Sequence, residues 1–288
     1  MQLQPNCGIF RKIFIPMNAN SVLRLNAWIE NLQARGEWSF SLSQAKNELL
    51  NYSDVALKRA ISRLSVKGNI VSIYKGYYLI LPPQYAKAGV LPPELFIDAF
   101  FEFLDRPYYV SLLNAAALHG ASHQQPQEFF ITTGFPSMRP THKNGMKINY
   151  ISIGKFPGKL LEKRKTEAGY INISNPVLTA TDMVQFEKRI GGINRAATVL
   201  VELSEILRPE DFDGEIIKQS PVTTLQRLGF ILENACHDTE LADALFTALQ
   251  QNQMKLYRIP LKTSVKTEGY SSANRWKVIV NTIIETDI

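Results

Sequence analysis

Hydrophobic residues in the first third of the chain recur at helical spacing in three short segments. Between Ser21 and Gln33 the apolar residues Leu23, Leu25, Trp28, Ile29 and Leu32 lie at helical spacing, and the segment is followed by Gly36. This pattern predicts a helix that ends near the glycine. The same spacing predicts helices over Gln44–Leu50 and Val55–Val66. Between the first two helices, Trp38–Phe40 is expected to form a short extended piece.

Polar residues mark where these helices begin and end. Ser43 can cap the second helix, and Ser53 followed by Asp54 is an N-cap signal for the third. Lys67 and Gly68 suit the end of the third helix, because a basic residue is favourable in the last turn and glycine is favoured at C′.

Two runs rich in β-branched and aromatic residues follow the third helix. Ile70–Tyr74 and Tyr77–Leu81 are separated only by Lys75 and Gly76, and a two-residue turn that ends in glycine is typical of a tight hairpin. Helix, strand, helix, turn, helix and hairpin is the order of a winged helix-turn-helix. We therefore predict this fold for the first part of the chain.

The rest of the chain mixes predicted helices and strands without regular βαβ alternation, which favours an α+β fold. The predicted helices are Leu95–Leu104, Ser111–His119, Pro176–Lys188, Asn194–Leu207, Val222–Ala235 and Glu240–Gln250. The predicted strands are Phe129–Thr133, Ile148–Ile153, Tyr170–Ile173 and Trp276–Asn281.

Two proline pairs, at 82–83 and 92–93, indicate a boundary between the two parts, because proline ends helices and cannot donate to a sheet. We predict an N-terminal extension (1–20), a winged helix-turn-helix (21–82), a proline-bounded linker (83–92) and an α+β domain (93–288).

The positive charge is concentrated before this boundary. Residues 1–90 hold eleven Lys and Arg against four Asp and Glu, a net charge of +7, whereas the other 198 residues hold 21 basic and 22 acidic residues. A basic module joined to a neutral body indicates a polyanionic partner, and double-stranded DNA is the first candidate.

The third predicted helix has the side chains that such a partner requires. Its apolar stripe leaves Lys58, Arg59, Ser62 and Arg63 on the outer faces, where long donors can reach base edges and phosphates. Lys75 would touch DNA from the hairpin. The predicted DNA-binding residues are Ser43, Ser53, Lys58, Arg59, Ser62, Arg63, Lys67, Tyr74, Lys75 and Tyr77. The alternative is a solvated helix face on a module that docks protein.

Other polar pairs are interpreted as structural, and we expect no catalytic residue, metal or cofactor. His119 and His123 have metal-ligand spacing, but Gly120 interrupts the helix and no third ligand is near in sequence. Asp211 and Asp213 resemble paired carboxylates, but Pro209 and Gly214 frame them as a loop in which Asp caps helices. The sequences Gly191-Gly192 and Cys236-His237 are interpreted as a turn and a helix end.

The composition favours a cytoplasmic protein. Cys7 and Cys236 are too few and too far apart for a disulfide scaffold, and Arg11 and Lys12 interrupt the N-terminal apolar stretch. The longest uncharged run, Pro107–Gln127, is rich in polar residues and is a poor membrane span.

Several segments together resemble the AbiEi family of antitoxins. They are Val90–Ile97, Arg106–Gly120, Asn175–Asp182, Arg189–Leu200 and Arg275–Asn281. The resemblance extends from about residue 40 to the end.

The resemblance implies a bacterial cytoplasmic antitoxin whose winged helix binds inverted repeats in operator DNA and represses its own operon. Its C-terminal domain would neutralise a nucleotidyltransferase-like toxin without a stable complex. Ser53–Arg63 would then be the operator-reading helix and Ile70–Leu81 the wing. Segments such as Ala115–Gly120 and Gly191–Arg195 would be packing motifs, because the family offers no agreed catalytic residue.

Two other functions stay open from the sequence. The first is a ligand-responsive repressor with an apolar pocket in its C-terminal part. The second is a metal-dependent nucleotidyltransferase or nuclease that uses Asp211 and Asp213.

Overall fold

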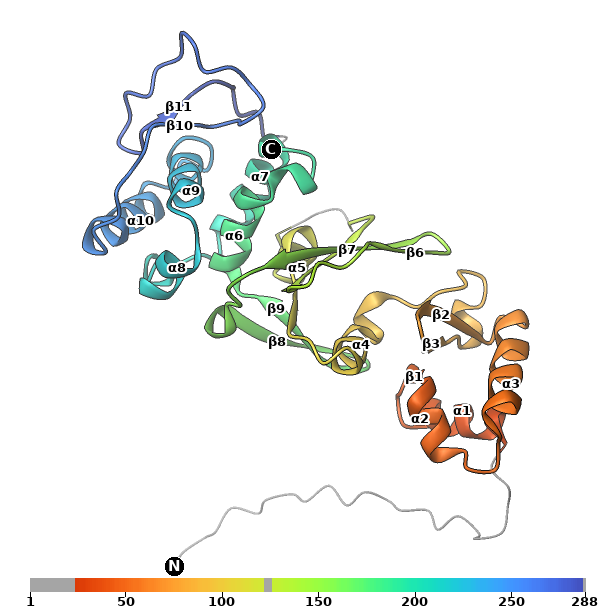
Figure 1. The fold of residues 1–288 in the computed structure, drawn as a ribbon. Coiled ribbons are helices and arrows are strands. Elements are labelled where there is room, and N and C mark those ends of the chain that lie inside the picture. The colour runs from red at the N-terminus through yellow and green to blue at the C-terminus, as the bar shows by residue number, and fades with distance from the viewer. Residues whose placement is uncertain (1–23, 122–125, 287–288) are drawn as a thin grey trace, which may run out of the picture.

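The computed structural model describes residues 24–121 and 126–286, and its fold is mixed α+β (Figure 1). A small helical module with its own sheet lies at one end, a six-stranded sheet lies in the middle, and a group of helices lies at the other end. The α+β prediction is confirmed.

Residues 24–82, which we call the N-terminal module, contain three helices and a three-stranded sheet. Its elements are α1 (Leu25–Ala34), β1 (Ser39–Ser41), α2 (Leu42–Glu48), α3 (Asp54–Val66), β2 (Ile70–Tyr74) and β3 (Tyr77–Ile80). They follow the predicted order with small shifts at their ends. The helices bury a shared apolar core that includes Trp28, Leu32, Phe40, Leu57 and Ile61.

The helix ends follow from the local residues, with one correction. Ser53 caps α3, and its hydroxyl accepts from the Ala56 N–H at 3.3 Å. The predicted cap Ser43 is wrong, because α2 begins directly after the extended residue Ser41. The Ser41 hydroxyl accepts from the Gln44 N–H at 3.0 Å.

The three strands form one antiparallel sheet in the order β1-β3-β2. Gly76 has φ +76°, a conformation that glycine adopts without strain, and it closes the predicted turn after Lys75. The carbonyl of Gly76 accepts from the Leu42 N–H at 2.8 Å. The turn of the hairpin therefore lies beside the start of α2.

The connection to the rest of the chain is ordered. It contains two 3₁₀ turns, η1 (Pro83–Tyr85) and η2 (Pro93–Leu95), and leads to α4 (Ile97–Phe103). Phe100 of α4 packs against Tyr77 of the hairpin, with ring centroids 5.1 Å apart. The sheet of the N-terminal module thus packs against α4.

The six-stranded sheet has the order β6-β7-β5-β4-β9-β8 and mixes parallel and antiparallel pairs. Side chains alternate along β4: Tyr108 and Val110 face the core around α4, whereas Tyr109 faces the helical group. The strands are β4 (Tyr108–Val110), β5 (Phe129–Gly134), β6 (Thr141–Lys143), β7 (Met146–Ile153), β8 (Leu161–Thr166) and β9 (Gly169–Ser174).

The helices of the larger part lie beyond the other face of this sheet, and the first two of them pack against its strands (Figure 1). They are α5 (Leu112–Leu118), α6 (Pro176–Gln185), α7 (Ile193–Ser204), α8 (Gly214–Gln219), α9 (Val222–Asn234) and α10 (Thr239–Gln251), with the turns η3 (Gly158–Leu160), η4 (Glu187–Arg189) and η5 (Pro209–Asp211). Among the described residues, no helix is long and apolar enough to cross a bilayer.

After α10 the chain lies across α9 in a mostly irregular segment, residues 252–286, which we call the C-terminal strap. It contains a two-residue parallel pair, β10 (Ile259–Pro260) and β11 (Val278–Ile279). The predicted strand Trp276–Asn281 is therefore too long. The side chain of Asn281 donates to the carbonyls of Lys262 and Val265, both at 2.9 Å, and holds the strap in a loop rather than a ladder.

Candidate nucleic-acid interface

The outer face of α3 is basic and exposed. Leu57, Ala60, Ile61 and Leu64 are buried, whereas Lys58, Arg59, Ser62 and Arg63 are exposed. Lys58, Arg59 and Arg63 form no ion pair with any residue that the structure describes. These three cations are therefore available to an external anion.

Asp54 is the one acidic residue of α3, and its charge is balanced within the module. Its carboxylate accepts a hydrogen bond from Lys46 of α2, and this bond lowers the pKa of the Asp54 carboxyl. Asp54 lies in the first turn of α3, where a negative charge is also favourable to the helix dipole. The pair joins the end of α2 to the start of α3.

The predicted serines lie at the two helix starts. Ser53 is exposed, but its hydroxyl caps α3. Ser43 is exposed at the start of α2, with its hydroxyl oxygen 2.8 Å from that of Ser41. Both are at the surface, at opposite ends of α2.

The hairpin residues separate into exposed and buried ones. Lys75 is exposed at the turn, but Tyr77 is only 2% exposed and its hydroxyl lies 2.6 Å from that of Ser39. Burial raises the pKa of Tyr77 well above its ordinary value. Tyr74 is 45% exposed and sets its ring against Phe100 of α4. We therefore remove Tyr77 from the expected DNA contacts, because it belongs to the core.

Lys67 lies at the far end of α3 and extends the basic surface. Together with Arg24 and Arg63 it lines a hollow of about 260 Å³ beside α1, which Tyr52 also borders. Sequence reasoning missed Arg24, because the residue precedes α1 and only the fold brings it next to Lys67. The spacing of charges along one helix could not have found it.

The remaining polar pairs have structural roles. The Nε2–H of His119 donates to the Ser174 carbonyl at 2.7 Å, and His123 lies outside the described residues. Asp211 accepts from the Arg208 N–H, and Asp213 accepts from two N–H groups at the start of α8. Among the residues that the structure describes, no group of three or more His, Cys, Asp or Glu could hold a metal ion.

The glycine and cysteine pairs also lie where the sequence indicated. Gly191 and Gly192 both have φ +103° and turn the chain from η4 into α7. Cys236 follows the end of α9, and burial raises the pKa of its thiol to about 12, so that the thiol keeps its proton at neutral pH.

One buried carboxyl lies between the six-stranded sheet and the helices. Asp182 of α6 is 4% exposed, and the Tyr109 hydroxyl donates to it at 3.0 Å. Burial raises the pKa of Asp182 to about 7, although the hydrogen bond from Tyr109 opposes this shift. The carboxyl therefore keeps its proton in the folded chain under mildly acidic conditions.

We expect the stability of the chain to fall as pH rises from about 4 to 7. An unfolded Asp loses its proton near pH 3.9, so in this interval the folded state binds one more proton. The free energy of unfolding should decrease by up to about 1.4 kcal/mol per pH unit from this group. Asp182→Asn keeps the shape of the side chain and an oxygen that accepts from Tyr109. This variant should therefore reduce the dependence of the free energy of unfolding on pH.

Urea unfolding of the wild type and Asp182→Asn at pH 5, 6, 7 and 8 measures this effect. Asp105→Asn is the matched control, because Asp105 is exposed and has φ +50°, a conformation that Asn tolerates. If the free energy of unfolding changed with pH in the same way in the wild type and in Asp182→Asn, Asp182 would not titrate in this range.

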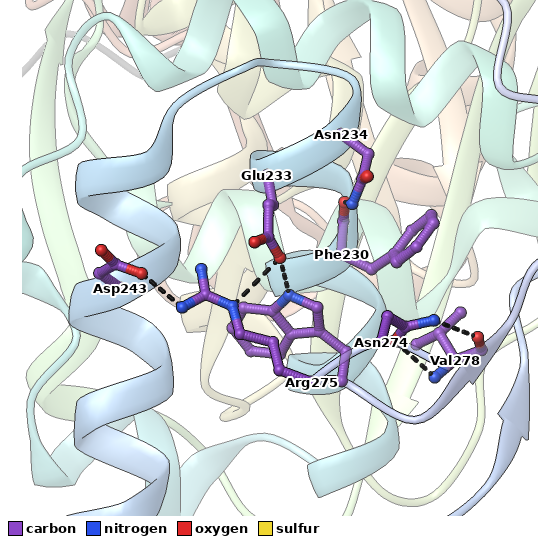
Figure 2. A network of polar contacts seen from close by, with 8 residues as sticks. Phe230, Glu233, Asn234, Asp243, Asn274, Arg275 and Val278 are labelled. Carbon is purple, nitrogen blue, oxygen red and sulfur yellow. Dashed lines mark hydrogen bonds and ion pairs between the residues drawn. The ribbon is translucent and has the colours of Figure 1, made fainter. Parts of the chain in front are cut away.

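The C-terminal strap is fixed to α9 by a second polar network (Figure 2). Arg275 donates to Glu233 at 3.1 Å and pairs with Asp243 of α10, while the Trp276 indole N–H donates to the same Glu233. The guanidinium of Arg275 also lies 5.2 Å from the ring centroid of Phe246. The strap therefore joins α9 to α10.

These features describe a small basic module and a larger α+β body, and among the described residues no group of His, Cys, Asp or Glu could hold a metal ion. Comparison with known protein families gives a match for the larger part. Residues 109–234, from β4 to α9, match the family model of the AbiEi antitoxin C-terminal domain. This match supports the AbiEi family and an antitoxin role in a toxin–antitoxin system.

The fold is also similar to that of a solved structure over most of both chains. The chain is similar to the crystal structure of the RV2827C protein from Mycobacterium tuberculosis, with a TM-score of 0.65 and 15% sequence identity over 88% of this chain and 89% of that one. At this identity the similarity concerns the fold alone. A search of curated proteins finds no match.

Proposed function

We propose that the chain is an antitoxin that binds operator DNA through a winged helix-turn-helix and represses its own operon, and that also neutralises a nucleotidyltransferase-like toxin. The observation that carries the DNA-binding part is the exposed face of α3, with three cations that pair with no described residue. The element order and the sheet order β1-β3-β2 support the winged helix-turn-helix.

In this proposal α3 enters the major groove with its N-terminal half. Arg59 and Ser62 face the bases directly, and Lys58 and Arg63 flank them and reach base edges or phosphates. Arg24 and Lys67 contact phosphates beyond the end of α3, and Lys75 touches the backbone from the hairpin turn. Long-range attraction is supplied by the excess of basic residues in the first third of the chain.

The antitoxin part of the proposal rests on the family match. The matched residues form the six-stranded sheet from β4 to β9 and the helices α5 to α9. The toxin partner would be neutralised without a stable complex. An antitoxin domain indicates a role other than catalysis, and the separate structural roles of Asp211 and Asp213 argue against the nuclease alternative.

A ligand-responsive repressor is the second candidate, and one cleft favours it. A hollow of about 790 Å³ lies in the larger part of the chain, with Leu91, Leu118 and Met146 among its lining. A metabolite bound there would raise the melting temperature of the chain. Absence of such a shift across a metabolite panel would remove this candidate.

Two readouts in one bacterial strain test the proposed function. We expect the full chain to silence a reporter driven by the DNA upstream of its gene, and to restore growth when the neighbouring nucleotidyltransferase-like gene is induced. Lys58→Ala with Arg63→Ala should release the reporter but still restore growth, because the exposed face of α3 lies outside the matched antitoxin residues.

If this variant lost both reporter repression and growth rescue at normal protein levels, the assignment of the two functions to separate parts of the chain would be contradicted. Growth arrest that the wild type does not relieve would contradict the antitoxin role itself.

A further inference from the structure

The exposed face of α3 holds an apolar residue where a solvated helix would have a polar one. Val55 lies in the first turn and is 59% exposed. Val55, Arg59, Ser62 and Val66 follow the spacing i, i+4, i+7 and i+11, so they form one stripe along the helix. The buried residues Leu57, Ala60, Ile61 and Leu64 lie on the opposite side.

The surroundings of Val55 favour a nucleic acid as the occupant of this stripe. Arg59 follows Val55 by one turn on the same face, and Lys58 and Arg63 flank the stripe on its two sides. An apolar protein surface would leave these cations without counter-charges, whereas a DNA groove supplies phosphates beside the bases. The stripe thus combines cations with an exposed valine at each end, and Val55 is the one in the first turn of α3.

In the major groove, thymine is the base that presents a methyl group. A valine side chain has no donor or acceptor, so its favourable contact with a base edge is the apolar one. Opposite any other base pair the valine would cover a polar edge and leave it without a hydrogen bond.

We propose that Val55 determines part of the operator specificity by packing against a thymine methyl group in each half-site. This inference rests on the proposed function and names a specificity residue within it. Arg59 and Ser62 would read the bases next to that thymine, because they follow Val55 along the same stripe.

Replacing thymine by deoxyuridine removes the methyl group and leaves every hydrogen-bonding atom of the base in place. We expect the wild type to bind a deoxyuridine duplex of its upstream DNA about fourfold more weakly at each half-site than the thymine duplex. Val55→Ala should bind the thymine duplex about fourfold more weakly per half-site, and should not distinguish the two duplexes. Alanine is the stronger helix former, so α3 keeps its structure.

Val66→Ala is the matched control. Val66 lies on the same stripe, is 86% exposed and occupies the end of α3 far from the first turn, so this variant should retain the wild-type preference for thymine. Titrations followed by fluorescence anisotropy, with a scrambled duplex alongside, measure all three proteins.

Two results would overturn the inference and leave the proposed function intact. One is tight, specific operator binding that deoxyuridine does not weaken, and the other is an equal sensitivity to deoxyuridine in the wild type and Val55→Ala. A change of oligomeric state in Val55→Ala, with unchanged base preference, would assign the stripe to self-association instead. Equal binding to native and scrambled duplexes would overturn the proposed function together with this inference.

Discussion

Replacing Lys58 and Arg63 together by alanine should lower the affinity of the chain for its operator by roughly 100-fold. Each side chain is exposed on α3 and forms no ion pair among the described residues, so each is free to bind a base edge or a phosphate. A base-edge contact contributes about 1–3 kcal/mol, and a lost phosphate contact also reduces the dependence of binding on salt by about one unit of slope.

The matched control is Lys163→Ala with Lys165→Ala, two exposed lysines of the edge strand β8. Both double variants lower the net charge by the same amount, so a purely electrostatic effect would weaken binding equally. We expect the β8 variant to bind the operator within a few-fold of the wild type. Fluorescence anisotropy at two salt concentrations distinguishes the outcomes, and equal losses would contradict a specific role of α3.

Replacing Gly229 by alanine should lower the free energy of unfolding by about 3 kcal/mol or more. Gly229 lies within α9 directly under the indole of Trp276, and an added Cβ atom would come within 2.1 Å of the ring. Trp276 is fully buried, so the ring must leave its place and expose apolar surface. The better helix propensity of alanine offsets only about 1 kcal/mol of this loss.

Thermal unfolding of Gly229→Ala should show a decrease in melting temperature of roughly 10 °C. Gly154→Ala is the control, because a Cβ atom at Gly154 meets nothing within 4 Å. Trp276→Phe in the Gly229→Ala background should recover part of the lost stability, since the smaller ring leaves space for the methyl group. A melting temperature unchanged by Gly229→Ala would contradict the packing of the C-terminal strap on α9.

The elements of the N-terminal module could be predicted from sequence because each has a local signal. The periodicity of Leu57, Ala60, Ile61 and Leu64 defines α3, and Ser53 and Gly68 mark its ends. The elements of the larger α+β part were harder to predict, since several of its strands have no such signal. Four of the six residues of β8 are charged, and only pairing with β9 makes the segment a strand.

The environments of individual side chains could likewise be predicted only where a local signal exists. Strand alternation alone places Tyr77 on the face of Leu79, and this signal could have excluded Tyr77 from the DNA contacts before the structure was known. No such signal exists for Arg24, which lines the same hollow as Lys67 and Arg63 only because α1 packs against α3. Likewise, Trp276 is recognisable as an apolar residue, but its place over Gly229 depends on how the strap crosses α9.

Binding of the purified full chain to the DNA directly upstream of its own gene tests the central claim most directly. Fluorescence anisotropy should show much tighter binding to this duplex than to a scrambled one, typically by a factor of 10³ or more, with a steep dependence on salt. Equal and weak binding to both duplexes would contradict operator recognition and reduce the basic face of α3 to a general electrostatic surface.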